Sequence, residues 1–185
     1  MDPALLKTME EKMQKSIEVF KKDLSGIRTG RATPALLDRI QADAYGSPMP
    51  LNQLANIAVP DARSMVIQPW DKTLLGAIEK AILKSDIGIH PVNDGNAIRL
   101  AIPPLTEERR KDLVKVVKKK SEEGKVSLRN IRREVNDDLK KLEKAGTASE
   151  DEARKTTEKV QKITDKYIKD FDEMASHKER EIMEI

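Results

Sequence analysis

A row of lysine and arginine side chains between residues 104 and 141 is the part of this chain best suited to binding chemistry. If the segment is a helix, which turns about 100° per residue, six of these cations fall within about 40° of one direction, and two more lie at about 60°. The six are Lys111, Lys118, Lys125, Arg129, Arg132 and Lys140, and the two are Lys115 and Arg133. Such a row suits a phosphate backbone, because each contact releases condensed counterions. Arginine adds a planar fork of donors that can hold phosphate through two hydrogen bonds.

The alternative is that this row is only a solvated helix face whose cations pair with neighbouring acids. Few acids lie close to the row, with Glu122 and Glu143 among them, and on the residues alone this scarcity leaves the two interpretations evenly balanced. Because the row contains no aromatic residue, contact with the backbone or shape of a nucleic acid is favoured over base stacking.

Catalytic chemistry finds little support in the sequence. His90 and His177 have no Ser, Cys or carboxylate partner at a recognisable spacing, and each is interpreted as structural or solvated. Metal-ligand spacings and glycine-rich nucleotide loops are absent from the sequence. The lack of any cysteine excludes thiolate catalysis and cysteine-based metal sites. We therefore predict a protein that is not an enzyme and that needs no cofactor or metal.

Three amphipathic helices are predicted to position the basic row. The first begins near Pro3 and ends at Gly30, where a glycine can stop a helix. The second follows Pro104, with Thr106 as its N-cap, and ends at Gly146. The third opens with a capping box at residues 149–152, Ser-Glu-Asp-Glu.

The apolar residues of these helices recur at alternating steps of three and four, which is the pattern of a bundle seam. They are Leu6, Met9, Met13, Ile17, Phe20, Leu24 and Ile27; Leu113, Val117, Gly124, Leu128, Ile131, Val135, Leu139 and Leu142; and Ala153, Val160, Ile163, Tyr167, Phe171, Met174 and Ile182. None of the helices can bury its stripe alone, so we expect a three-helix bundle. The second helix then runs opposite to the other two, and the C-terminus returns toward the first breakpoint.

Residues 31–103 have a different pattern, with Pro and Gly punctuating short apolar runs. We predict strands at 40–44, 55–59, 65–69, 87–90 and 97–102, a turn over 45–50, and one helix capped by Asp71. A hairpin-type turn is expected at 93–96, Asn-Asp-Gly-Asn. Trp70 is predicted to pack beneath the helix, with a docking contact as the alternative. The segment is therefore an inserted small α+β domain, joined to the rod by two connections that make a hinge possible.

Composition agrees with an elongated helical body. Hydrophobic residues make up 38% of the chain, charged residues 36% and aromatic residues 3%, which suits a narrow seam better than a large spherical core. Residues 104–141 carry 13 basic and 8 acidic groups, so the positive charge is concentrated on the second helix. We find no apolar run of membrane-spanning length and no signal-peptide pattern, and we expect a cytoplasmic protein.

Five segments, in this order and spacing, resemble those of bacterial ribosome recycling factors. They are IRTGRATP at 27–34, GSPMPL at 46–51, PPLTEERRK at 103–111, RNIRR at 129–133 and SEDE at 149–152. The resemblance covers essentially the whole chain. It implies an L-shaped α+β molecule with a tRNA-like outline, in which 1–30 and 104–185 form a three-helix bundle that binds ribosomal RNA and 31–103 form the inserted domain.

The resemblance also implies a role after translation termination. The factor would bind large-subunit ribosomal RNA near the peptidyl-transferase region, and elongation factor G with GTP would act on it to separate the subunits. We expect seven basic residues to bind RNA, and the resemblance implies that two of them, Arg129 and Arg132, are the principal contacts. The seven are Arg129, Arg132, Arg133, Arg110, Lys118, Lys125 and Arg28. The hinge set is Gly30, Arg31, Pro103, Pro104 and Thr106. We expect the chain to act as a monomer.

Two other functions are compatible with a basic helical protein. The first is a generic helical adaptor that binds a protein partner through its seam or insert. The second is peripheral membrane association through the basic face, which is disfavoured because interfacial helices need bulky apolar residues beside the basic stripe.

Overall fold

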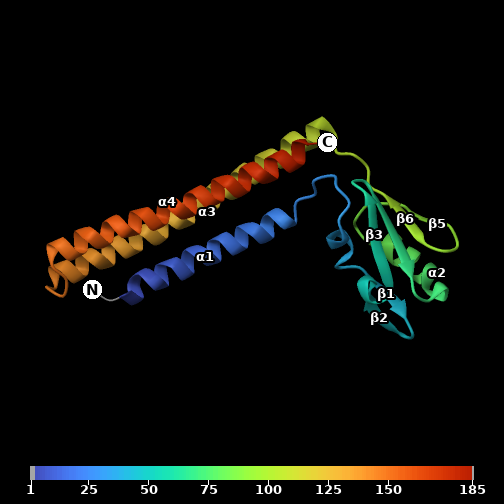
Figure 1. Ribbon diagram of the computed structural model, residues 1–185, viewed down its shortest axis with the longest axis horizontal. Helices are drawn as coiled ribbons and strands as arrows, with labels where there is room; N and C mark the ends of the chain where they lie inside the picture. Colours follow the sequence, from blue (N-terminus) through green and yellow to red (C-terminus); the bar gives the residue numbers. More distant parts are fainter. Residues whose placement is uncertain (1–2, 185) are drawn as a thin grey trace. The chain divides into compact units, whose positions relative to one another are not determined.

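The computed structural model describes residues 3–184 and contains two compact units (Figure 1). One unit combines the described part of Met1–Arg28 with Glu107–Glu184, and the other comprises Thr29–Thr106. Within the described residues, no helix has both the length and the apolar character needed to cross a membrane.

The first unit is a bundle of α1 (Pro3–Ser25), α3 (Glu107–Lys144) and α4 (Glu150–Met183). Figure 1 shows α3 and α4 side by side along their length, and α1 contacts both of them. The helix α4 ends beside the start of α3, so the predicted directions of the three helices are confirmed. The α+β fold class and the helical bundle are likewise as predicted.

The seam of the bundle follows the predicted stripe with a local shift in α4. Ile163 and Met174 are only half-buried, whereas the adjacent Thr164 and Ala175 are buried. The hydroxyl of Thr164 donates to the carbonyl of Val160 at 2.7 Å, which satisfies its polar group inside the seam. Small side chains at these positions leave room for close helix packing, and the larger neighbours lie along the edge of the seam.

The helix ends explain where the bundle stops. At the end of α3, the N–H of Gly146 donates to Glu143 O and that of Thr147 to Leu142 O, both at 3.0 Å, and Gly146 has a φ of 72°. These two bonds form a Schellman motif, so the predicted stop is confirmed. The capping box of Ser149 and Glu152 is present at the start of α4.

The predicted end of the first helix is wrong. The helix α1 ends at Ser25, where the Ser25 hydroxyl donates to Lys22 O at 2.7 Å and the N–H of Gly26 donates to the same carbonyl at 3.3 Å. Gly30, with a φ of 76°, lies five residues further along, in the connection to the second unit. Its left-handed backbone belongs to that connection and does not cap the helix.

The second unit contains a two-stranded and a four-stranded antiparallel sheet. The smaller sheet pairs β1 (Gln41–Ala44) with β2 (Ser47–Pro50). The larger sheet has the order β3 (Ala55–Asp61), β4 (Ser64–Pro69), β6 (Ile98–Ala101) and β5 (Pro91–Asn93). Apolar residues of α2 (Leu75–Lys84) join Met65, Ile67, Ile98 and Leu100 in one core, so the helix covers one face of this sheet. Short 3₁₀ helices lie at Pro34–Leu37, Leu51–Gln53 and Lys72–Leu74.

Two local predictions in this unit are corrected. Only Tyr45 and Gly46 form the turn predicted over 45–50; their φ values of 52° and 85° fit a two-residue hairpin turn, so Ser47–Pro50 can pair as a strand. The strand predicted at 87–90 is instead Pro91–Asn93, although Ile87 and Ile89 are buried in the core.

The turn predicted at 93–96 is present and is organised by Asp94. Its carboxylate accepts hydrogen bonds from the N–H groups of Ala97 and Asn96 at 2.8 and 2.9 Å and from Arg99 Nε at 3.1 Å. These bonds, led by the one from Ala97, lower the pKa of Asp94 to about 2, so the carboxylate that holds the turn is ionised at neutral pH.

Trp70 is not packed beneath the helix, which contradicts the prediction. Its residue surface is 70% exposed, and Tyr45 is 76% exposed.

The Tyr45 hydroxyl donates to Asp71 Oδ2 at 2.7 Å, while Asp71 Oδ1 accepts from the N–H of Thr73 at 3.0 Å. Asp71 therefore caps the short 3₁₀ helix that precedes α2, as its position in the sequence predicted.

Both connections enter the second unit beside the β3–β4 turn. The N–H of Ala32 donates to Ala62 O and that of Ile102 donates to Arg63 O, each at 2.7 Å. The residues expected to form a hinge are Gly30, Arg31, Pro103, Pro104 and Thr106. They lie just before or just after these two anchoring bonds in the chain.

Candidate nucleic-acid interface

The basic row of the sequence lies on α3, a single helix of 38 residues. We call it the basic ridge, and its members are Lys111, Lys115, Lys118, Lys125, Arg129, Arg132, Arg133 and Lys140. Because one helix carries them all, their spacing is fixed by the helical repeat. The buried stripe of α3 packs into the bundle, which holds the ridge in one orientation relative to α4.

Members of the ridge differ in exposure. Lys111, Lys115, Lys118, Arg133 and Lys140 are exposed, whereas Lys125, Arg129 and Arg132 are half-buried. Half-buried arginines can still present donors to a ligand, because the stem packs against the protein while the guanidinium stays at the surface.

The two central arginines contact neighbouring polar groups. Arg129 Nη1 lies 3.0 Å from Glu122 Oε1 on the same helix. Arg132 Nη1 donates to Gln161 Oε1 of α4 at 3.4 Å, and Gln161 in turn donates to Asp165 Oδ1 at 2.8 Å. Each guanidinium group therefore has a polar partner within the bundle.

Lys125 is less available to a ligand than the exposed members of the predicted set. Its ammonium group makes an ion pair with Asp172 of α4, and its side chain is 18% exposed. This contact joins α3 to α4, so part of its role is to hold the bundle together. Lys111, by contrast, is well exposed and pairs with Glu107 one turn away at 3.1 Å.

Arg28 and Arg110 lie at the end of the bundle where α1 stops and α3 begins. Arg28 is exposed just beyond α1, and Arg110 is half-buried in the first turn of α3. They are thus at the opposite end of α3 from Lys140.

Three α4 residues that contact the ridge directly or through a neighbour were not predicted from the sequence: Gln161, Asp165 and Asp172. A signal was present, because steps of four and seven place them on one side of a helix. Their side could not be assigned to the ridge without knowing which face of α4 meets α3.

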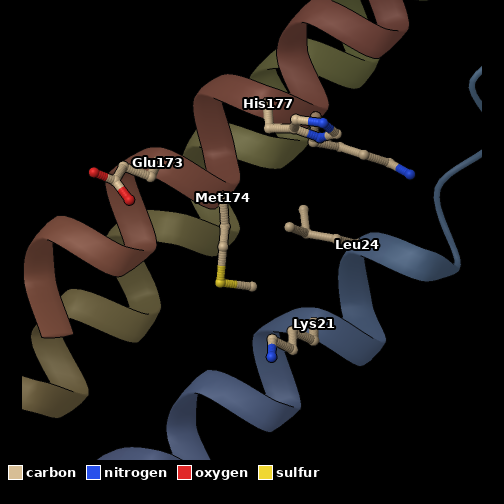
Figure 2. Close-up of a pocket in the computed structure, with 6 residues that line it drawn as sticks. Lys21, Leu24, Glu173, Met174 and His177 are labelled. Carbon is tan, nitrogen blue, oxygen red and sulfur yellow. The ribbon is translucent and has the colours of Figure 1, made fainter.

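A separate groove of about 400 Å³ lies between α1 and α4 (Figure 2). Figure 2 shows Leu24 of α1 and Met174 of α4 in its interior, with Lys21 and Glu173 nearby. His177 also lines it, and His177 Nδ1 lies 3.2 Å from Glu181 Oε1. The described residues contain no cluster of three or more His, Asp or Glu side chains that could hold a metal ion. The groove combines apolar contacts with both signs of charge and lacks the cation density of the ridge.

Comparisons of the sequence and of the structure with known proteins agree on one family. A family model described as "Ribosome recycling factor" matches residues 20–183. Ribosome-recycling factors of Bacillus mycoides and Symbiobacterium thermophilum are 58% and 55% identical to the chain over 185 residues, and each alignment covers all of both proteins.

Two solved structures are also similar. One is described as the solution structure of the ribosome recycling factor; it has a TM-score of 0.75 and 42% identity and covers 98% of this chain and 97% of its own. The other is described as models for the T. thermophilus ribosome recycling factor and the E. coli elongation factor G bound to the E. coli post-termination complex. Its TM-score is 0.62, with 51% identity and 97% of each chain covered.

Proposed function

Because the chain belongs to the ribosome recycling factor family, we propose that it acts with elongation factor G and GTP to release ribosomes from mRNA after termination. The released subunits are then available for a new round of translation. The chain is a translation factor and not an enzyme; in this proposal GTP hydrolysis belongs to elongation factor G.

The observation that carries the molecular part of the proposal is the basic ridge on α3. Its eight cations lie along one side of a single helix, five of them exposed and three half-buried, and phosphate neutralisation along such a row is favoured by counterion release. The ridge lacks aromatic side chains, so it suits the backbone and shape of folded RNA better than unstacked bases. We assign 1–30 and 104–185 to the RNA-binding domain, with large-subunit ribosomal RNA near the peptidyl-transferase region as its target.

In this proposal Arg129 and Arg132 are the principal phosphate contacts. Arg133 and Lys118 extend the ridge on its exposed side, while Arg110 and Arg28 contact RNA near the connections. Lys125 contributes mainly electrostatic attraction, since Asp172 holds its ammonium group.

The inserted domain, 31–103, receives the action of elongation factor G. The solved relative bound to a post-termination complex together with elongation factor G supports this partnership. The segments around Gly30 and Pro103–Pro104 serve as the hinge between the two domains, and the factor works as a monomer in the cytoplasm.

A binding assay and a splitting assay test the proposal together. Arg132→Ala is expected to weaken binding to purified large subunits about tenfold, which corresponds to ~1.4 kcal/mol, because a charged phosphate contact is lost. The melting temperature should change little, since the hydrogen bond from the half-buried Arg132 to Gln161 is long, at 3.4 Å, and contributes little to folding. We expect the unchanged chain to split ribosomes into subunits only when elongation factor G and GTP are present. Light scattering measures this splitting.

Arg154→Ala is the matched control. Arg154 is an exposed arginine on α4 that pairs with Asp151 at 2.9 Å, outside the ridge. Its replacement should leave both assays unchanged. Equal affinities of the Arg132 variant and the unchanged chain would contradict the assigned role of the ridge.

A further inference from the structure

Glu122 occupies an unusual position on α3. It is an acid within the basic ridge, at about 40° from the direction of Lys118 on a helical projection. Its carboxylate Oε1 lies 3.0 Å from Arg129 Nη1, and its side chain is 61% exposed while that of Arg129 is 37% exposed. The neighbouring Glu123 is also exposed but, among the described residues, makes no ion pair.

The contact constrains the guanidinium group. Glu122 and Arg129 are seven positions apart, about 10 Å along the helix axis, so both side chains must extend along the helix to meet. The Arg129 guanidinium therefore lies along the ridge with one donor already used. A phosphate on the ridge would need the same planar set of donors, and a carboxylate and a phosphate compete for it.

The carboxylate also acts on the phosphate itself. A phosphate bound by Arg129 would lie within a few ångströms of Glu122, and two like charges at such a distance repel one another. Both effects have the same sign: breaking the ion pair costs free energy, and the released carboxylate stays near the bound anion.

We propose that Glu122 is an intramolecular competitor of RNA phosphate that limits the affinity of the ridge. This inference rests on the proposed function, since it assumes that Arg129 contacts ribosomal RNA. In the free factor Glu122 holds Arg129; on the ribosome RNA displaces it; and when the factor leaves, Glu122 takes the guanidinium back. A factor that must dissociate after each round benefits from such a counter-ion, because differences in affinity appear mainly in the dissociation rate.

The test compares Glu122→Gln with Glu123→Gln. The two variants remove the same charge from adjacent residues of one helix, but only the first removes the partner of Arg129. We expect Glu122→Gln to bind purified large subunits about threefold more tightly than Glu123→Gln, within the range of exposed ion pairs. It should also dissociate more slowly, and the difference should shrink as added salt screens the charges. Circular dichroism melting curves should be alike.

The same pair of variants in an Arg129→Ala background completes the test. Without the guanidinium, Glu122→Gln and Glu123→Gln should bind equally. Equal or weaker binding of Glu122→Gln in the presence of Arg129 would overturn the inference, as would a difference that persists without Arg129. So would an Arg129→Ala variant that binds as well as the unchanged chain. If the unchanged chain fails to bind large subunits at all, the proposed function falls with it.

Discussion

Two lysines seven residues apart on α3, Lys118 and Lys125, have different environments. Lys118 is exposed to solvent, whereas Lys125 is mostly covered and pairs with Asp172, a residue 47 positions later in the chain. Helical geometry predicts that both point to one side, because that depends only on the repeat. It cannot predict which cation an acid from another helix neutralises. The position of the ridge was therefore predictable from sequence, and the availability of each side chain was not.

The exposure of Trp70 has a physical reason that the sequence contained. In β4, Met65, Ile67 and Pro69 are buried, while Gln68 is exposed. Successive residues of a strand point to opposite faces, so Trp70 continues the alternation on the side of Gln68. The prediction that it packs beneath the helix gave more weight to the size of the ring than to this period of two.

Trp70 is the sole tryptophan, so intrinsic fluorescence tests its environment directly. We expect emission typical of water-exposed indole and strong quenching by acrylamide in the folded protein, because 70% of the residue surface is accessible. Unfolding in urea should change the emission maximum only slightly. A maximum that shifts to longer wavelength on unfolding, together with weak quenching in the native state, would contradict the exposed position.

At the scale of elements, the bundle seam contains one glycine where an apolar residue would be expected. Gly124 of α3 faces Phe171 of α4, and a Cβ at position 124 would lie 2.1 Å from a ring carbon. The Phe171 ring is fully buried and stacks on Phe20 of α1 with centroids 4.8 Å apart. The heptad pattern predicted that residue 124 lies in the seam. It could not show that a ring from α4 fills the space above it.

Gly124→Ala should destabilise the protein by about 1–3 kcal/mol, because the added methyl group overpacks a core in which the stacked rings have little room to move. Gly76→Ala is the matched control, since a Cβ there would have no heavy atom within 4 Å and residue 76 lies in α2. That change should be neutral or stabilising by up to about 1 kcal/mol, as alanine is the better helix former. Urea unfolding measures both; a Gly124→Ala variant as stable as the unchanged chain would exclude the close packing.

Helix boundaries show how far local signals reach. The capping box at Ser149 and the Schellman motif at Gly146 were predictable because each uses bonds between residues a few positions apart. The end of α1 was not, because Gly30 has the dihedral angle of a helix stop but serves the connection to the second unit. Glycine alone does not state which of these roles it has.

At the scale of the whole molecule, two connections join a bundle that carries the ridge to a domain that does not. The second unit is charge-balanced, with seven basic and seven acidic residues in Thr29–Thr106, and the surplus of cations lies in the first unit. The alternation of patterns along the chain made this inserted organisation predictable. The ribosome, elongation factor G and the step in translation came only from family resemblance, because composition and spacing do not specify a partner.

Gly30→Pro tests whether the connections act as a hinge. Proline cannot adopt the φ of 76° found at this position, because its ring holds φ near −65°. The connection must therefore change, while the ridge on α3 is untouched. We expect the variant to bind large subunits nearly as well as the unchanged chain and to lose most of its splitting activity with elongation factor G and GTP. Equal losses in the two assays would count against the hinge.

The salt dependence of binding to large ribosomal subunits shows whether the α3 ridge binds RNA phosphates. The logarithm of the association constant should fall steeply and linearly with the logarithm of salt concentration. Arg132→Ala should make the slope shallower by about one unit, whereas Arg154→Ala should leave it unchanged. A flat salt series, or equal slopes for the unchanged chain, Arg132→Ala and Arg154→Ala, would show that the ridge does not bind phosphates.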